Sequence, residues 1–92
     1  MITNLSVMEK LSAYLDHRLT LAALVEWAEQ ALMEEEFDEG NVETLRDIVS
    51  RLGLADVRAF GLTWEDCETF LSRLGYQVRV EVSVAKDAAP MR

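Results

Sequence analysis

Apolar residues recur at helical spacing along most of this chain, in short segments that capping residues begin and glycines end. The clearest segment spans residues 21–35 and follows Thr20, a residue type that caps helices. Its apolar stripe consists of Leu21, Leu24, Val25, Ala28, Ala31 and Leu32. Trp27 lies beside this stripe, and we expect it to widen the core face. Such stripes must be buried against one another, which favours packed helices.

Two further segments predict helices on either side of this one. Ser6 and Glu9 have the spacing of a capping box, so we expect a short helix that begins there and fades near His17. Asn41 is a favourable cap for a third helix, and Gly53 predicts its end in a left-handed conformation.

The fourth predicted helix begins at Thr63, with Asp66 at the third position and Gly75 as its stop. Its inward residues are expected to be Cys67, Phe70, Leu71 and Leu74. Between the third and fourth helices, residues 54–60 read as a single helical turn that Gly61 stops. The chain thus predicts a compact bundle of about four helices.

After Gly75 the hydrophobic period changes to two. Valines and a tyrosine alternate with polar residues, which predicts a half-buried strand over residues 76–84. The residues on its apolar face are Tyr76, Val78, Val80, Val82 and Val84. We therefore expect a mainly α (α+β) domain over residues 1–85, with a flexible tail over residues 86–92.

The predicted strand needs a partner, because unpaired backbone amides and carbonyls make an exposed edge. The chain has no second convincing strand, since residues 1–5 alternate poorly. The strand can pair with the N-terminus, with its own copy across a two-fold axis, or with a different protein. We favour self-pairing in a homodimer.

The acidic side chains are unevenly distributed. The net charge is −8, and residues 1–40 hold nine acids against two bases. Such a surface attracts basic proteins and repels phosphate backbones, which argues against nucleic-acid binding. The densest run is typical of a solvated turn, in which acids favour the start of the next helix, and it also predicts a partner-binding acidic face. The residues of this face are Glu34, Glu35, Glu36, Asp38 and Glu39.

Residues with the chemistry for catalysis or metal binding are scarce. One histidine, His17, and one cysteine, Cys67, cannot build a structural zinc site, and Cys67 falls on an apolar stripe as an inert core thiol does. No glycine-rich phosphate loop is present. We predict no enzyme and no cofactor.

The composition is that of a globular protein, with 50% hydrophobic and 28% charged residues. No apolar run approaches the ~20 residues that cross a bilayer, and the first residues lack the pattern of a secretory signal. We therefore expect a cytoplasmic protein without membrane contact.

Residues 74–82, LGYQVRVEV, resemble the helix end and strand of some helix-turn-helix antitoxins of bacterial toxin–antitoxin pairs. This resemblance covers about a tenth of the chain. It implies that the tail serves oligomerisation or partner contact. No basic recognition helix is present, so the DNA-binding activity of that family does not transfer.

Three functional hypotheses follow. The first is a non-enzymatic protein-interaction module, antitoxin- or immunity-like, whose acidic face binds a basic protein. The alternative is a self-assembling homodimeric structural or regulatory domain joined by residues 76–84. The third is a small enzyme or effector-binding domain with a pocket near Trp64, although packing of Trp64 against Phe60 is also expected.

Overall fold

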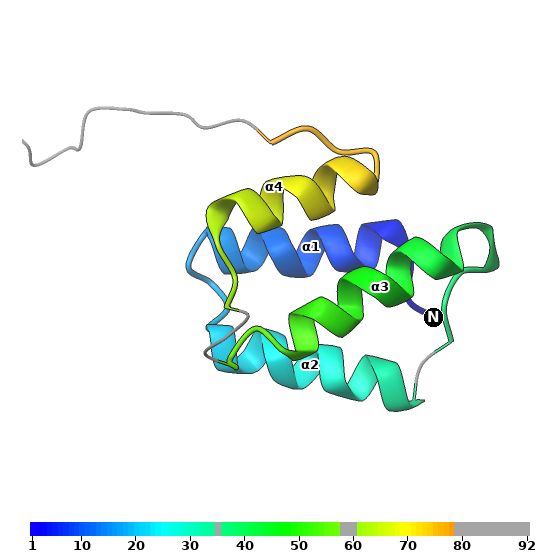
Figure 1. Cartoon of the computed structure of the whole chain (residues 1–92), viewed down its shortest axis with the longest axis horizontal. Coiled ribbons are helices and arrows are strands. Elements are labelled where there is room, and N and C mark those ends of the chain that lie inside the picture. Colours follow the sequence, from blue (N-terminus) through cyan, green and yellow to red (C-terminus); the bar gives the residue numbers. More distant parts are fainter. Residues whose placement is uncertain (35, 58–60, 79–92) are drawn as a thin grey trace, which may run out of the picture.

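Helices form most of the structure, a computed structural model that describes residues 1–34, 36–57 and 61–78. The helices are α1 (Asn4–Leu15), α2 (Leu21–Glu34), α3 (Val42–Gly53) and α4 (Trp64–Arg73), and a 3₁₀ turn, η1 (Glu39–Asn41), precedes α3. The predicted mainly helical class with four helices is confirmed for the described residues (Figure 1).

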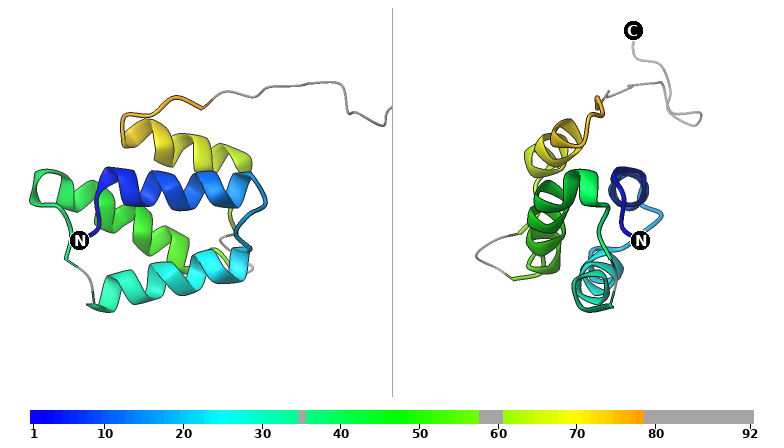
Figure 2. Two further views of the ribbon diagram at one scale, coloured as in Figure 1. Left: turned by 180° about the vertical axis from the view of Figure 1, so that it is seen from behind. Right: turned by 90° about the vertical axis from the view of Figure 1, so that its right-hand side faces the viewer.

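The helices pack in alternating directions. Helices α1 and α2 run in opposite directions, and α4 lies beside α1 and also runs opposite to it (Figures 1 and 2). Helix α3 packs most extensively against α2 and also contacts α1. The N-terminus and the start of α3 therefore lie at one end of the bundle, and the start of α4 lies at the other (Figure 1).

All four helices contribute to one hydrophobic core. Among its most buried members are Val7, Leu11, Leu24, Ala28, Leu45, Ile48, Val49 and Leu52, together with the predicted inward residues Cys67, Phe70, Leu71 and Leu74. Trp27 is half-buried and packs against this core, as its place beside the apolar stripe predicts. The Lys10 ammonium lies 5.7 Å from the centre of its ring.

The start of α1 differs from the prediction. Thr3 is the cap, because its hydroxyl accepts from the Ser6 amide at 3.1 Å while the Thr3 amide donates to the Ser6 hydroxyl at 3.3 Å. Ser6 is therefore the third helical residue, and a box that begins at Ser6 is wrong. The Thr3–Ser6 box and the predicted Ser6–Glu9 box share Ser6, and the Thr3–Ser6 box extends the helix toward the N-terminus.

Helix α3 begins after Asn41 and ends at Gly53 as predicted, but neither end has the predicted local geometry. Asn41 occupies the cap position but makes no capping bond, and its side-chain Nδ2 donates instead to Asn4 Oδ1 at 2.9 Å. Gly53 is the last helical residue and is buried, so the predicted helix end is confirmed, but its φ is not positive and the predicted left-handed conformation is wrong. A Cβ on Gly53 would lie 3.8 Å from side-chain atoms of Glu29 and Leu32, which places this glycine at the contact with α2.

The predicted boundaries of α4 are confirmed. The Thr63 hydroxyl accepts from the Asp66 amide at 3.1 Å, and the Thr63 amide donates to the Asp66 carboxylate at 2.9 Å. Gly75 adopts a φ of 91°, a left-handed conformation that glycine tolerates and that ends the helix. Before α4, residues 54–57 form a turn and bend rather than the predicted helical turn, and residues 58–60 lie outside the described residues.

The predicted strand over residues 76–84 is not supported. Residues 76–78 form no strand, because the Tyr76 amide bonds to the Leu71 carbonyl at 2.9 Å and both Tyr76 and Val78 pack against the core. Val80, Val82, Val84 and the predicted tail over residues 86–92 lie outside the described residues, so homodimer pairing through them stays a prediction.

The strand-like pairing in the described residues is an isolated parallel bridge between Ile2 and Phe37. The Ile2 amide donates to the Glu36 carbonyl at 2.6 Å, and the Asp38 amide donates to the Ile2 carbonyl at 2.9 Å. The N-terminus thus pairs with the acidic run and not with residues 76–78.

Candidate functional site

Two candidate surfaces lie at opposite ends of the bundle. The first, called here the acidic end, carries the carboxylates of Glu36, Asp38, Glu39 and Glu43 between α2 and the first turn of α3. The second, called here the apolar pocket, lies where α1 ends and where α2 and α4 begin. The acidic end is on the side of the N-terminus in Figure 1, and the apolar pocket is on the opposite side.

Phe37 fixes the backbone of the acidic end. Its side chain is 8% exposed and belongs to the core, and its backbone is bridged to Ile2. The Arg46 guanidinium lies 5.4 Å from the centre of the Phe37 ring. Because neighbouring side chains alternate along an extended segment, burial of Phe37 directs Glu36 and Asp38 away from the core.

The carboxylates of the acidic end face solvent. Glu36, Glu39 and Glu43 are exposed, and Asp38 is half-buried, with its Oδ1 accepting from the Gly40 amide at 3.2 Å. Within the described ranges, none of these four makes an ion pair. Like charges held close together raise the local negative potential, which favours a cationic partner.

The structure gathers part of the predicted acidic face. Glu36, Asp38 and Glu39 lie on one turn, Glu34 is the last residue of α2, and Glu35 lies outside the described residues. The sequence reasoning missed Phe37 as the anchor of this turn. A single aromatic residue within an acidic run was the available signal.

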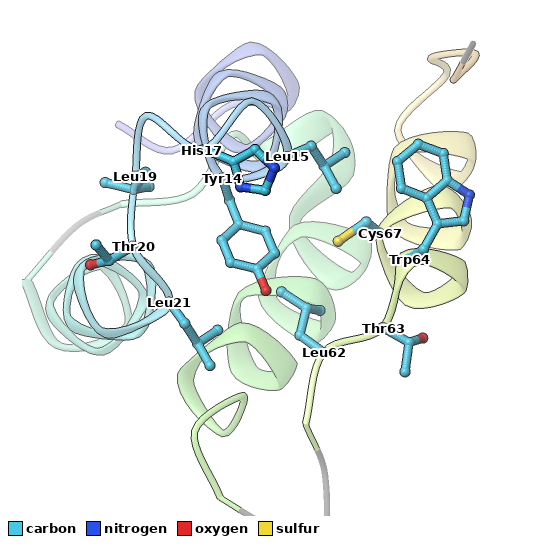
Figure 3. A pocket seen from close by; sticks show the side chains of 10 residues that line it. All are labelled: Tyr14, Leu15, His17, Leu19, Thr20, Leu21, Leu62, Thr63, Trp64 and Cys67. Atoms are coloured by element: carbon cyan, nitrogen blue, oxygen red, sulfur yellow. The ribbon is translucent and has the colours of Figure 1, made fainter. Parts of the chain in front are cut away.

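The apolar pocket has a volume of about 650 Å³. Its ten described lining residues come from the end of α1, the turn that leads into α2, and the segment that enters α4 (Figure 3). Most of the walls are apolar, formed by Tyr14, Leu15, Leu19, Leu21, Leu62, Trp64 and Cys67. The sequence singled out Trp64 for such a pocket, but the other walls belong to no motif.

The polar residues of the pocket have defined local roles. His17 is exposed in the turn after α1, where it adopts a left-handed φ of 64°. The Thr20 hydroxyl accepts from the Ala23 amide at 3.1 Å, which confirms Thr20 as the cap of α2. Thr63 caps α4 with Asp66. These threonine hydroxyls are therefore already engaged.

Cys67 is buried beside the pocket and is 1% exposed. Burial, together with the neighbouring Asp66 carboxylate, raises the pKa of the Cys67 thiol to about 11. The thiol is therefore protonated near neutral pH, whereas a nucleophile needs the thiolate. This supports the interpretation of Cys67 as an inert core thiol.

Asp66 contributes to helix capping next to the pocket. The Thr63 backbone amide, the Thr63 hydroxyl and the Arg51 guanidinium, 3.8 Å away, together lower the pKa of the Asp66 carboxyl despite its partial desolvation. The folded protein therefore favours the ionised form of the Asp66 carboxyl.

The described residues contain no group of three or more histidine, cysteine, aspartate or glutamate side chains placed to hold a metal ion. Across residues 1–34, 36–57 and 61–78, no helix combines the length and apolar character that crossing a membrane requires.

Comparisons with known proteins give no match: no family model, no curated protein and no solved structure matches this chain. The resemblance of residues 74–82 to helix-turn-helix antitoxins stays a prediction. A proposal for function must therefore rest on the geometry of the two surfaces.

Proposed function

We propose that this chain is a non-catalytic protein-interaction module that binds a basic partner protein through its acidic end. One observation carries the proposal. The burial of Phe37 and its bridge to Ile2 hold Glu36, Asp38 and Glu39 on a fixed backbone, with no ion pair to a described cation.

A basic partner would complement the charge of this surface. The carboxylates lie within a short segment, so their negative potentials add and attract a cationic surface. Fixed backbone geometry also lowers the entropy lost on binding, because the turn is already ordered. Electrostatic complementarity of this kind gives fast association and selectivity for partner charge.

The proposed role is of the type that antitoxins and immunity proteins perform, in which a small acidic protein covers a basic surface of another protein. It requires no catalytic group in this chain. The fixed acidic turn supplies the charge, and the helical core supplies a rigid support for it.

A pair of charge-reversal variants tests the proposal. The test variant is Glu36→Lys with Glu39→Lys. The control is Glu26→Lys with Glu68→Lys, which changes the net charge equally at exposed positions on α2 and α4. Each protein is isolated from its own cells at low salt and studied by native mass spectrometry, and the affinity for the co-purified partner is measured over a range of salt concentrations.

We expect the test variant to bind about tenfold more weakly and to lose most of the salt dependence, since each exposed charge pair contributes about 0.2–1 kcal/mol. The control should keep the affinity within about twofold. Equal losses in both variants would show a general charge effect and contradict the proposed site. A clean homodimer without a partner would favour the alternative of self-assembly.

A further inference from the structure

The apolar pocket is an open continuation of the hydrophobic core. Tyr14, Leu15, Leu19 and Leu62 are half-buried, pack against the core and also line the pocket, and the buried Cys67 lines it too. Its volume of about 650 Å³ lies within the range of about 300–1,000 Å³ that is usual for small-molecule sites. The pocket is thus large enough for a ligand of one to three rings.

Two aromatic side chains face this space. Figure 3 shows the Tyr14 ring and the Trp64 indole on either side of the Cys67 thiol. Trp64 is 41% exposed, which leaves much of a large apolar side chain in water. Aromatic rings favour offset or edge-to-face contacts with other aromatic rings, so an aromatic ligand fits these walls.

The hydrogen-bonding groups of the pocket are few. The Thr20 and Thr63 hydroxyls already accept helix amides, whereas the Tyr14 hydroxyl and the Trp64 indole N–H make no hydrogen bond within the described residues. A mostly apolar space with a few free polar groups is typical of a site that orients a small molecule.

Charge decides the class of ligand. No lysine, arginine, aspartate or glutamate is among the described lining residues. Arg18, next to His17, forms an ion pair with Asp16, and Asp66, next to Cys67, forms an ion pair with Arg51. An anion would find no lysine or arginine among the described lining residues and would meet a protein of net charge −8. A cation would lose hydration without a carboxylate in the lining.

We propose that the apolar pocket binds a small, uncharged aromatic molecule, held between Tyr14 and Trp64. This site is separate from the acidic end and does not depend on the proposed protein partner.

Two fluorescent probes that share one ring system test the charge selection. N-phenyl-1-naphthylamine is neutral, and 1-anilinonaphthalene-8-sulfonate is the same ring system with an added sulfonate. We expect the neutral probe to bind about tenfold or more tightly than the sulfonate, because the pocket offers the anion no counter-charge. Equal affinities, tighter binding of the sulfonate, or no binding of the neutral probe would overturn the proposal.

The position of the neutral probe is measured on the unaltered protein by nuclear magnetic resonance. The chain contains two tryptophans, of which Trp64 lines the pocket and Trp27 does not, so their indole N–H signals distinguish the pocket from a position outside it. We expect the Trp64 signal to shift and the Trp27 signal to stay in place. A shift at Trp27 with none at Trp64 would overturn the proposed site.

A matched pair of substitutions completes the test. Trp64→Leu removes an aromatic wall from a partly exposed position and should weaken binding of the neutral probe about fivefold or more. Trp27→Leu removes the tryptophan outside the pocket and should leave the affinity within about twofold. Unchanged binding in folded Trp64→Leu would contradict the aromatic contact.

Discussion

The acidic end and the apolar pocket expose opposite kinds of group to solvent. At the acidic end, the apolar residues Ile2 and Phe37 are buried, whereas the nearby carboxylates face solvent. At the apolar pocket, the polar groups of Thr63 and Asp66 are engaged in capping, whereas the Trp64 ring remains partly exposed. The first arrangement suits a charged macromolecule, and the second suits an apolar small molecule.

The largest effect is expected from a substitution that removes Phe37, the anchor of the acidic end. Phe37→Ala deletes a buried ring and its contact with Arg46, and should lower the free energy of unfolding by about 3–4 kcal/mol. Chemical denaturation followed by circular dichroism measures this change.

Met33→Ala is the control for that experiment. Met33 is 82% exposed near the end of α2, so its truncation should change the free energy of unfolding by less than about 0.5 kcal/mol. Similar small losses in both variants would show that the acidic end is not anchored through Phe37.

The second prediction concerns the thiol beside the apolar pocket. With a pKa of about 11 against an ordinary 9.0, Cys67 should hold about 100-fold less thiolate at neutral pH than a free cysteine. Reaction with a disulfide reagent in the folded protein should be slower by at least that factor. Fast labelling that matches the unfolded protein would contradict the described burial of Cys67.

Loss of the cap at the entrance to α4 should have a smaller effect. Thr63→Ala removes the hydroxyl that accepts from the Asp66 amide, and should lower the free energy of unfolding by about 1 kcal/mol. Thr63→Ser keeps the acceptor and serves as the matched control in urea denaturation. Equal stability of the alanine and serine variants would show that this hydrogen bond contributes nothing.

The smallest expected effect is on pH dependence. The pKa of Asp66 is lowered in the folded protein, so its stabilising contribution is present above the ordinary value of 3.8 and is lost as the pH falls through the folded value. The free energy of unfolding of the wild type and of Asp66→Asn is measured by urea denaturation at about pH 6 and about pH 3. The difference between the two proteins should be smaller at the lower pH. A larger difference at the lower pH would reverse the predicted sign.

Local patterns explain which parts of the fold could be predicted. The Thr63–Asp66 box and the Gly75 stop depend on residues a few positions apart, so the sequence was sufficient to place α4. The same rule misplaced the start of α1, because Thr3 and Ser6 form a second box that overlaps the predicted one.

The features that were missed depend on distant parts of the chain. Ile2 precedes α1 and Phe37 follows α2, so their pairing joins residues that are far apart in the sequence, and no local pattern indicates it. The helix end at Gly53 was predicted correctly, but the contact of Gly53 with α2 was not, because it depends on a different helix. The apolar pocket likewise draws its walls from three separate segments, so only Trp64 could be suggested from sequence.

Zero-length carbodiimide cross-linking of the protein with its partner, isolated together at low salt, tests the central claim most directly. This reagent joins a carboxylate to a lysine in contact with it, and mass spectrometry then identifies both residues. We predict that the cross-links to partner lysines concentrate at Glu36, Asp38, Glu39 and Glu43. Cross-links concentrated instead at Glu26, Glu65 or Glu68, with none at the acidic end, would contradict the account.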